Sequence, residues 1–260
     1  MHSDSIQFRR EGNGGVITLN RPSVFNSFNR EMALAMQHIL KECEEDHTVR
    51  CIVITGEGKA FCAGQDLGEV TSDNPPGFQT ILEEHYNPIV RAIQSMNKPV
   101  IAAVNGVAAG AGANIALCCD IVIMSSQASF IQAFSKIGLV PDSGGTWILP
   151  RLLGWQRASA LMMTGDKVDA SQSLAWGLCY KVYEPEVFVE SWQKLAEQIG
   201  AMPTLSLAYT KKLLTLSASQ DFNTQLRSET EYQIKAGATA DYQEGVKAFM
   251  EKRKPIFNGE

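Results

Sequence analysis

Short apolar runs alternate with segments of helical periodicity over most of the chain. Four runs are rich in apolar residues and bounded mainly by Gly, Asn or charged residues, which is typical of strands, and they lie at residues 16–19, 51–55, 100–104 and 121–124. Met32, Met36 and Ile39 belong to an apolar stripe at helical spacing, which predicts an amphipathic helix over residues 30–45. Small residues over 109–118 predict a second helix. Strands that alternate with helices indicate an α/β domain with crossover connections.

The pattern changes after about residue 195, where the strand signals cease. Helical periodicity continues in four stretches, at residues 189–200, 203–217, 221–236 and 241–252. This shift predicts a core domain over residues 1–195 and a C-terminal helical subdomain over residues 196–260. Within the core domain, the Pro- and Gly-containing residues 71–77 predict a turn-rich loop.

Composition and charge exclude several classes of protein. The 260 residues are 45% hydrophobic and 20% charged, which is ordinary for a globular protein and excludes a disordered chain. A net charge of -5 argues against a nucleic-acid-binding surface. No apolar run is long enough to span a bilayer, and the N-terminus carries neither an apolar signal region nor an Arg-rich stretch. We therefore expect a cytoplasmic protein that binds neither nucleic acid nor membrane.

Metal, disulfide and nucleotide motifs are missing from the sequence. The six cysteines form no C-x-x-C pair, and Cys118 and Cys119 are adjacent, so we expect reduced, mostly buried thiols. The four histidines show no metal-ligand spacing. Residues 56–59 lack the Ser or Thr that follows a P-loop lysine, and Ile115 replaces the third glycine of a dinucleotide fingerprint that begins at residue 110. We therefore expect no metal and no redox cofactor.

Small residues follow two of the predicted strands. Ala63 and Gly64 come after the strand at 51–55 and would let a ligand approach the backbone, although this segment taken alone favours a tight turn with Asp66 as a helix cap. Residues 105–114 run from a strand into a helix, whose unpaired N–H groups suit a developing oxyanion. The alternative for that segment is close helix packing through small side chains.

A single acidic residue stands out in the segment 133–147. Asp142 precedes a predicted helix, so its carboxylate either caps that helix or acts as a catalytic group in an apolar pocket. The residue pattern of this segment leaves both roles open.

The three segments together, in this order, resemble the crotonase (enoyl-CoA hydratase/isomerase) family, and the resemblance extends over essentially the whole chain. Further matching segments are Leu19-Asn20-Arg21-Pro22, Asn26-Ser27-Phe28, residues 61–67, residues 98–106 and Gly144-Gly145-Thr146. The resemblance implies an α/β spiral of ββα units with a C-terminal helical trimerisation region. It also implies an acyl-CoA substrate, with coenzyme A as part of that substrate, and assembly into a homotrimer or a hexamer of two trimers.

The resemblance also assigns the site residues. It places the oxyanion hole on the backbone N–H groups of Gln65 and Ala111, and the substrate- and CoA-binding positions on Ala63, Asp66, Leu67, Gly110, Asn114 and Phe134. Hydratases of this family use two glutamates at the positions of Asn114 and Phe134, and neither residue can act as a general base. Asp142 instead matches the position at which several isomerases and dehalogenases carry a catalytic aspartate.

Within the family, three segments are most similar to the ring 1,2-epoxyphenylacetyl-CoA isomerases of bacterial phenylacetate catabolism. These segments are residues 86–91, 133–147 and 240–246. The similarity implies conversion of a ring epoxide to an oxepin-CoA, a Δ3 to Δ2 enoyl-CoA double-bond shift, or both. Two alternatives stay open: another crotonase activity (dienoyl-CoA isomerase, dehalogenase, thioesterase or hydratase), and a non-catalytic acyl-CoA-binding protein.

Overall fold

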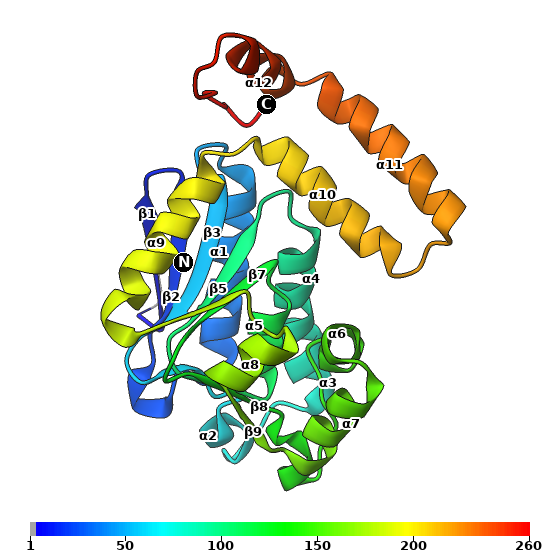
Figure 1. Cartoon of the computed structure of the whole chain (residues 1–260). Coiled ribbons are helices and arrows are strands. Elements are labelled where there is room, and N and C mark those ends of the chain that lie inside the picture. Colours follow the sequence, from blue (N-terminus) through cyan, green and yellow to red (C-terminus); the bar gives the residue numbers. More distant parts are fainter. Residues whose placement is uncertain (1–3) are drawn as a thin grey trace.

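Two β-sheets form the centre of the molecule in the computed structural model, which describes residues 4–260 (Figure 1). The first three residues of the N-terminal segment discussed above lie outside the described residues. The first sheet has six strands in the order β1 (Ile6–Glu11), β2 (Gly14–Leu19), β3 (Cys51–Gly56), β5 (Val100–Val104), β7 (Ile121–Ser125) and β10 (Lys181–Tyr183). Only β1 and β2 pair antiparallel in it.

A second, smaller sheet receives the chain after it leaves the first. Its four strands are β4 (Ala60–Cys62), β6 (Val107–Ala109), β8 (Ser129–Ile131) and β9 (Lys167–Asp169). The chain passes from β3 to β4, from β5 to β6 and from β7 to β8, and helical segments follow each pair. This repeated step from one sheet to the other and then into helices builds the expected spiral of ββα units.

Strand residues alternate between the two faces of the first sheet. Val53 packs on one face in a cluster with Trp192 of helix α9 (Pro185–Gly200). Ile52, on the other face, joins the main core together with the apolar stripe of α1 (Arg30–Glu45). Because helices cover both faces, the central strands consist of nearly unbroken apolar runs, and this continuity made them recognisable in the sequence.

Most predicted elements are confirmed, with instructive differences at their ends. Helix α1 has the predicted bounds, because Asn29 caps it by accepting a hydrogen bond from Met32 N at 3.0 Å. Helix α5 (Ala111–Leu117) begins two residues later than predicted, since residues 107–109 pair with β4 and β8 instead. Helix α9 begins four residues earlier than predicted, with a proline at its first position.

The remaining α-helices surround the core or extend from it. They are α2 (Leu67–Val70), α3 (Phe78–Thr80), α4 (Asn87–Ser95), α6 (Gly145–Leu153), α7 (Trp155–Thr164), α8 (Ala170–Trp176), α10 (Thr204–Ser217), α11 (Phe222–Gly237) and α12 (Ala240–Met250). Figure 1 shows α10 and α11 side by side at the edge of the core, and we call this pair the helical arm. Helix α12 lies near the end at which α10 begins and α11 ends. Helix α9 runs across residue 195 and packs on the sheet, so the helical arm starts at α10.

The sequence also led to expectations about thiols, membrane-spanning helices and metal sites. All six cysteines are free and buried, as expected. Within residues 4–260, no helix is long and apolar enough to cross a membrane. No group of His, Cys, Asp and Glu side chains in the same part of the chain could hold a metal ion.

Candidate active site

The loop after β4 brings a free backbone amide to the surface of the core. Phe28 N donates to Gly64 O at 2.7 Å, and Asp66 N donates to Phe28 O at 2.8 Å. Because these two bonds form a parallel bridge between Phe28 and Gln65, the Gln65 N–H points to the opposite side of the loop, where it meets no acceptor among residues 4–260. This N–H is available to a ligand.

A second free amide lies beside the first. Ala111 is the first residue of α5, so its N–H has no partner within the helix, and the preceding Gly110 offers no side-chain cap. Gly64 has φ +91°, and a Cβ placed on it would lie 3.4 Å from Ala111 N. A glycine is therefore required at position 64 by its backbone conformation and by this close approach. The close approach of Gly64 to Ala111 therefore brings the Gln65 and Ala111 amides close to each other.

Phe134 covers the turn that leads into α5. It is buried, and its ring would come within 3.7 Å of a Cβ placed on Gly110. Gly110 has φ +53° and is held by its own N–H, which donates to Ile131 O at 2.9 Å. Phe134 therefore supplies an apolar wall next to the Ala111 amide.

Asp142 lies in the turn between the 3-10 helix η3 (Ala133–Ile137) and α6. Its Oδ1 accepts a hydrogen bond from Ser143 Oγ at 2.8 Å, and it forms no ion pair within residues 4–260. Burial raises the pKa of this carboxyl above its ordinary value, and the Ser143 hydroxyl offsets part of that shift. A carboxylate that is desolvated and unpaired with a cation is suited to accept a proton.

The alternative role of Asp142 as a helix cap is wrong. Gly144 is the N-cap residue of α6, and α6 has no side-chain cap. The backbone carbonyl of Asp142, and not its carboxylate, accepts the Gly145 N–H at 2.9 Å. The Asp142 carboxylate therefore does not cap α6.

Asp66 does cap a helix, as the structural interpretation of this segment predicted. Its side chain accepts a hydrogen bond from Gly68 N at 2.8 Å at the start of α2, and it also forms an ion pair with Arg21 at 2.8 Å. Ala63 and Leu67 on either side are exposed, so a ligand can lie along this edge. The Gln65 side chain is tied to Glu69, with Nε2 donating to Oε2 at 2.7 Å.

Asn114 and Phe134, which the family resemblance places at the positions of the hydratase glutamates, have no carboxyl group. Both side chains are buried, and Asn114 is fully inaccessible to solvent. The two polar groups of the Asn114 amide are bonded within the protein, to Asp142 O and to Gln132. No carboxylate therefore stands at either position to activate a water molecule.

Tyr86 is a candidate site residue that the sequence interpretation did not include. Its ring is buried and lies 5.9 Å from the ring of Phe28, and its hydroxyl has no hydrogen-bond partner among the described residues. Burial raises the pKa of Tyr86 well above its ordinary value, and the nearby Cys62 and Asp142 raise it further. Tyr86 closes a short π-helical segment (Ile81–Tyr86), and such segments are frequent at functional sites but leave no clear sequence signal.

The site thus combines two free N–H donors with the half-buried carboxylate of Asp142. The donors can stabilise an oxyanion, and the carboxylate can move a proton on a neighbouring carbon. All residues that the sequence assigned to the site lie on the loop 63–67, at the start of α5 or in the segment 134–142.

Known proteins are similar to this chain over nearly its full length. A family model described as Enoyl-CoA hydratase/isomerase matches residues 9–260. The 1,2-epoxyphenylacetyl-CoA isomerase of Escherichia coli is 46% identical over 246 residues, which cover 94% of each chain. A probable enoyl-CoA hydratase of Rhodobacter capsulatus is 40% identical over 259 residues and 100% of each chain. The crystal structure of a putative enoyl-CoA hydratase/isomerase from Mycobacterium abscessus, 34% identical, superposes with a TM-score of 0.93 over 98% of this chain and 100% of its own.

Proposed function

This chain belongs to the enoyl-CoA hydratase/isomerase family, and on that basis we propose that it isomerises an acyl-CoA thioester through an enolate. One observation carries the proposal: the half-buried Asp142 carboxylate forms no ion pair within residues 4–260, while Asn114 and Phe134, at the positions that the resemblance gives to the hydratase glutamates, are buried and carry no carboxylate. The site can therefore move a proton along an acyl chain but has no second acid to activate water.

The mechanism begins with the thioester carbonyl between two amides. The N–H groups of Gln65 and Ala111 donate to the carbonyl oxygen and stabilise the negative charge that develops there as the enolate forms. Each such donor supplies on the order of 3 kcal/mol to the transition state. Asp142 takes a proton from the acyl chain and returns it at another carbon, which moves the double bond from Δ3 to Δ2.

The acyl group that we propose is a ring epoxide, with a Δ3-enoyl chain as a second substrate of the same site. The similarity to the 1,2-epoxyphenylacetyl-CoA isomerase of Escherichia coli supports 1,2-epoxyphenylacetyl-CoA as substrate and oxepin-CoA as product. The apolar Phe134 beside Gly110 suits an aromatic or unsaturated acyl group. Asp142 and the unpartnered Tyr86 hydroxyl are the polar groups available to the epoxide.

Coenzyme A lies, in this proposal, along the edge formed by Ala63, Asp66 and Leu67. Ala63 and Leu67 are exposed, and no metal or redox cofactor takes part in the proposed steps. A cytoplasmic location is proposed because the six cysteines are free thiols, as proteins of a reducing compartment carry. The proposal is tested directly by supplying purified protein with 1,2-epoxyphenylacetyl-CoA or a Δ3-enoyl-CoA and separating the products. Absence of turnover on both would refute it.

Hydration of crotonyl-CoA should be absent or very slow. The reason is that Asn114 and Phe134 cannot position and deprotonate a water molecule. The measurement is the loss of the enoyl-thioester absorbance, with isomerisation of a Δ3-enoyl-CoA by the same preparation as the control. A hydration turnover number of about 1–1000 per second, the common range for enzymes, would contradict the prediction and favour a hydratase.

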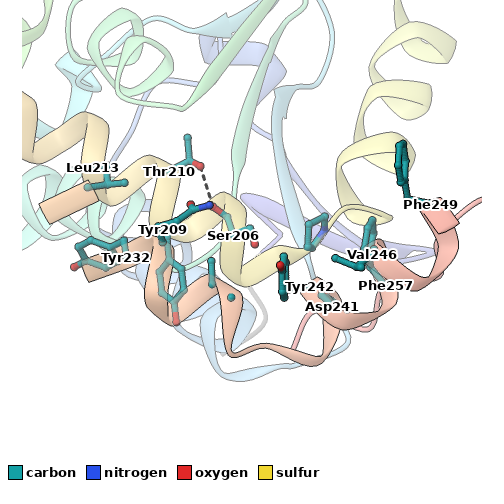
Figure 2. A pocket seen from close by; sticks show the side chains of 15 residues that line it. Ser206, Tyr209, Thr210, Leu213, Tyr232, Asp241, Tyr242, Val246, Phe249 and Phe257 are labelled. Atoms are coloured by element: carbon teal, nitrogen blue, oxygen red, sulfur yellow. Dashed lines mark hydrogen bonds between the residues drawn. The ribbon is translucent and has the colours of Figure 1, made fainter. Parts of the chain in front are cut away.

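We propose further that the helical arm joins copies of this chain in a trimer or a hexamer. A hollow of about 510 Å³ lies between α10, α11 and α12, and Figure 2 shows Tyr209, Tyr242 and Phe249 among the side chains around it. Phe249 is 82% exposed, and Leu214 on α10 is 69% exposed. Large apolar side chains gathered on one part of a surface are typical of contact with another protein.

The purified protein should therefore sediment as a trimer or hexamer at micromolar concentration. Replacing both Leu214 and Phe249 with glutamate should shift it towards the monomer, because a charge would then be buried at each contact. Val189→Glu is the matched control, since Val189 is a half-exposed apolar residue of α9 on the core. A wild-type monomer in analytical ultracentrifugation would rule out this assembly.

A further inference from the structure

Two buried amides hold the backbone of Asp142. Asn114 Nδ2 donates to Asp142 O at 2.8 Å, and Gln132 Nε2 donates to Asn114 Oδ1 at 2.8 Å. Asn114 is 0% exposed and Gln132 is 3% exposed. The three residues come from α5, from the segment before η3 and from the turn before α6, so the chain of hydrogen bonds joins three separate parts of the fold.

The start of α6 is shaped to accept the Asn114 amide. A Cβ placed on Gly145 would lie 2.4–2.7 Å from three atoms of that amide, so only glycine lets α6 begin there. Gly145 N also donates to Asp142 O at 2.9 Å. The Asp142 carbonyl therefore accepts two hydrogen bonds, and both fix its orientation.

The turn that these bonds hold is strained. Ser143 has φ +50°, a conformation that a residue with a side chain rarely adopts, and it is buried. Such conformations persist only where the surrounding structure imposes them, and they concentrate at functional sites. Ser143 also donates from Oγ to the Asp142 carboxylate, so a shift of the turn would move that carboxylate.

Helix α5 connects this turn to the oxyanion donors. Its first residue provides the Ala111 N–H, and Asn114 follows one turn later on the same rigid helix. A single short helix thus sets the distance between the amide that faces the thioester oxygen and the backbone of the residue that moves the proton.

We propose that Asn114, supported by Gln132, is a positioning residue that fixes Asp142 relative to the Ala111 amide. The inference rests on the proposed function in one respect, the use of Asp142 as the base. The chemistry requires an amide at position 114, because it must donate to one oxygen and accept from Gln132. An ionised carboxylate there would face the Asp142 carbonyl oxygen without a proton to donate.

The substitution Asn114→Asp tests this requirement, because it preserves the shape and removes the donor. Near pH 8 we expect kcat for isomerisation to fall by about tenfold or more, with KM changed by less than about threefold. At lower pH the introduced carboxyl gains a proton and can again donate to Asp142 O. The ratio of variant to wild-type kcat should therefore rise as the pH falls, a trend that simple loss of packing would not produce.

Other titratable groups around these amides do not produce that trend. Burial raises the pKa of Cys118 to about 12 and the pKa of Tyr86 well above its ordinary value, so neither titrates in this range. Asp142 titrates in both proteins, and Asp166 and Lys136 near Gln132 are present in both. Taking the ratio of the two proteins removes the titration that they share.

Asn13→Asp is the matched control. Asn13 Nδ2 also donates to a backbone carbonyl, Gly200 O at 3.2 Å, but it lies beside the amino end of β2, away from the loops that form the site. Its kcat ratio to wild type should stay near one and should not change with pH. Gln132→Met is the second variant, because it removes the donor to Asn114 and leaves Asn114 and Asp142 in place. Gln132→Met should lower kcat a few-fold. If Asn114→Asp does not fold, the kcat of Gln132→Met tests the positioning role instead.

A readout without turnover separates this inference from the proposed function. Hydrogen exchange of the Gly145 amide, which donates to Asp142 O, should speed up by about tenfold in Asn114→Asp. If the wild type shows no isomerisation, the proposed function fails, and this exchange rate alone decides on the positioning role. Unchanged Gly145 exchange, or a folded variant whose kcat ratio is near one or independent of pH, would overturn the inference.

Discussion

Replacing Asp142 with asparagine is expected to lower isomerisation by about 100-fold or more, the usual scale for loss of a general acid–base. The amide has nearly the same shape and can accept the Ser143 hydroxyl, but it cannot take a proton from the acyl chain. The turn should persist, since Asn114 and Gly145 hold the backbone carbonyl of residue 142 and not its side chain. Affinity for the CoA part of the substrate should remain.

The same substitution should not destabilise the protein at neutral pH. Burial raises the pKa of Asp142 above the ordinary value of 3.8 in the folded state, so the native protein binds this proton more tightly than the unfolded chain. Stability is therefore lost as the pH rises from the unfolded pKa through the folded one. The asparagine removes that loss, and the melting temperature at pH 7 should equal or exceed that of the wild type.

Two measurements check this prediction together, namely turnover and melting temperature of Asp142→Asn. In the wild type, kcat/KM should fall as the pH drops through the raised pKa of Asp142, because the base becomes protonated. Near-normal turnover in a well-folded variant would remove Asp142 from the mechanism. The search would then move to Tyr86, the last residue of the π-helical segment, and to Asn87, which follows it.

Replacing Ala111 with proline is expected to lower kcat by about 10²–10³-fold, the typical cost of losing one oxyanion donor. Proline lacks the N–H that donates to the thioester oxygen in the proposed mechanism, yet it is well tolerated at the first position of a helix. Gly110 has ψ −128°, outside the α region that a following proline disfavours. The substitution therefore removes the donor while α5 can still form.

Ala111→Gly is the comparison for that variant, because it keeps the N–H and removes only the methyl group. It should lose far less activity than the proline variant, and the melting temperatures should show that both proteins fold. Similar kcat values for Ala111→Pro and the wild type would mean that the Ala111 amide does not bind the developing oxyanion.

The sequence identified the site residues mainly through the resemblance to the crotonase family, which assigned the amides of Gln65 and Ala111. The local pattern accounts for the helix start that leaves the Ala111 N–H free, whereas the Gln65 N–H is oriented by the bridge to the distant Phe28. The long helices and central strands could also be predicted from the sequence. Burial of one face of a helix imposes an apolar period, and burial of both faces of a strand imposes an apolar run. The family and its α/β spiral with a C-terminal helical region were predicted from these segments and are confirmed.

The tertiary structure decided what depends on residues that are distant along the chain. The strands of the second sheet are three residues long and carry no apolar period, so only pairing with one another defines them. The role of Asp142 as a free carboxylate, and not a cap, depends on where α6 begins. The bond from Asn114 to Asp142 spans 28 positions in the sequence. Such contacts leave no local pattern, because folding alone brings their partners together and desolvates the groups that carry the chemistry.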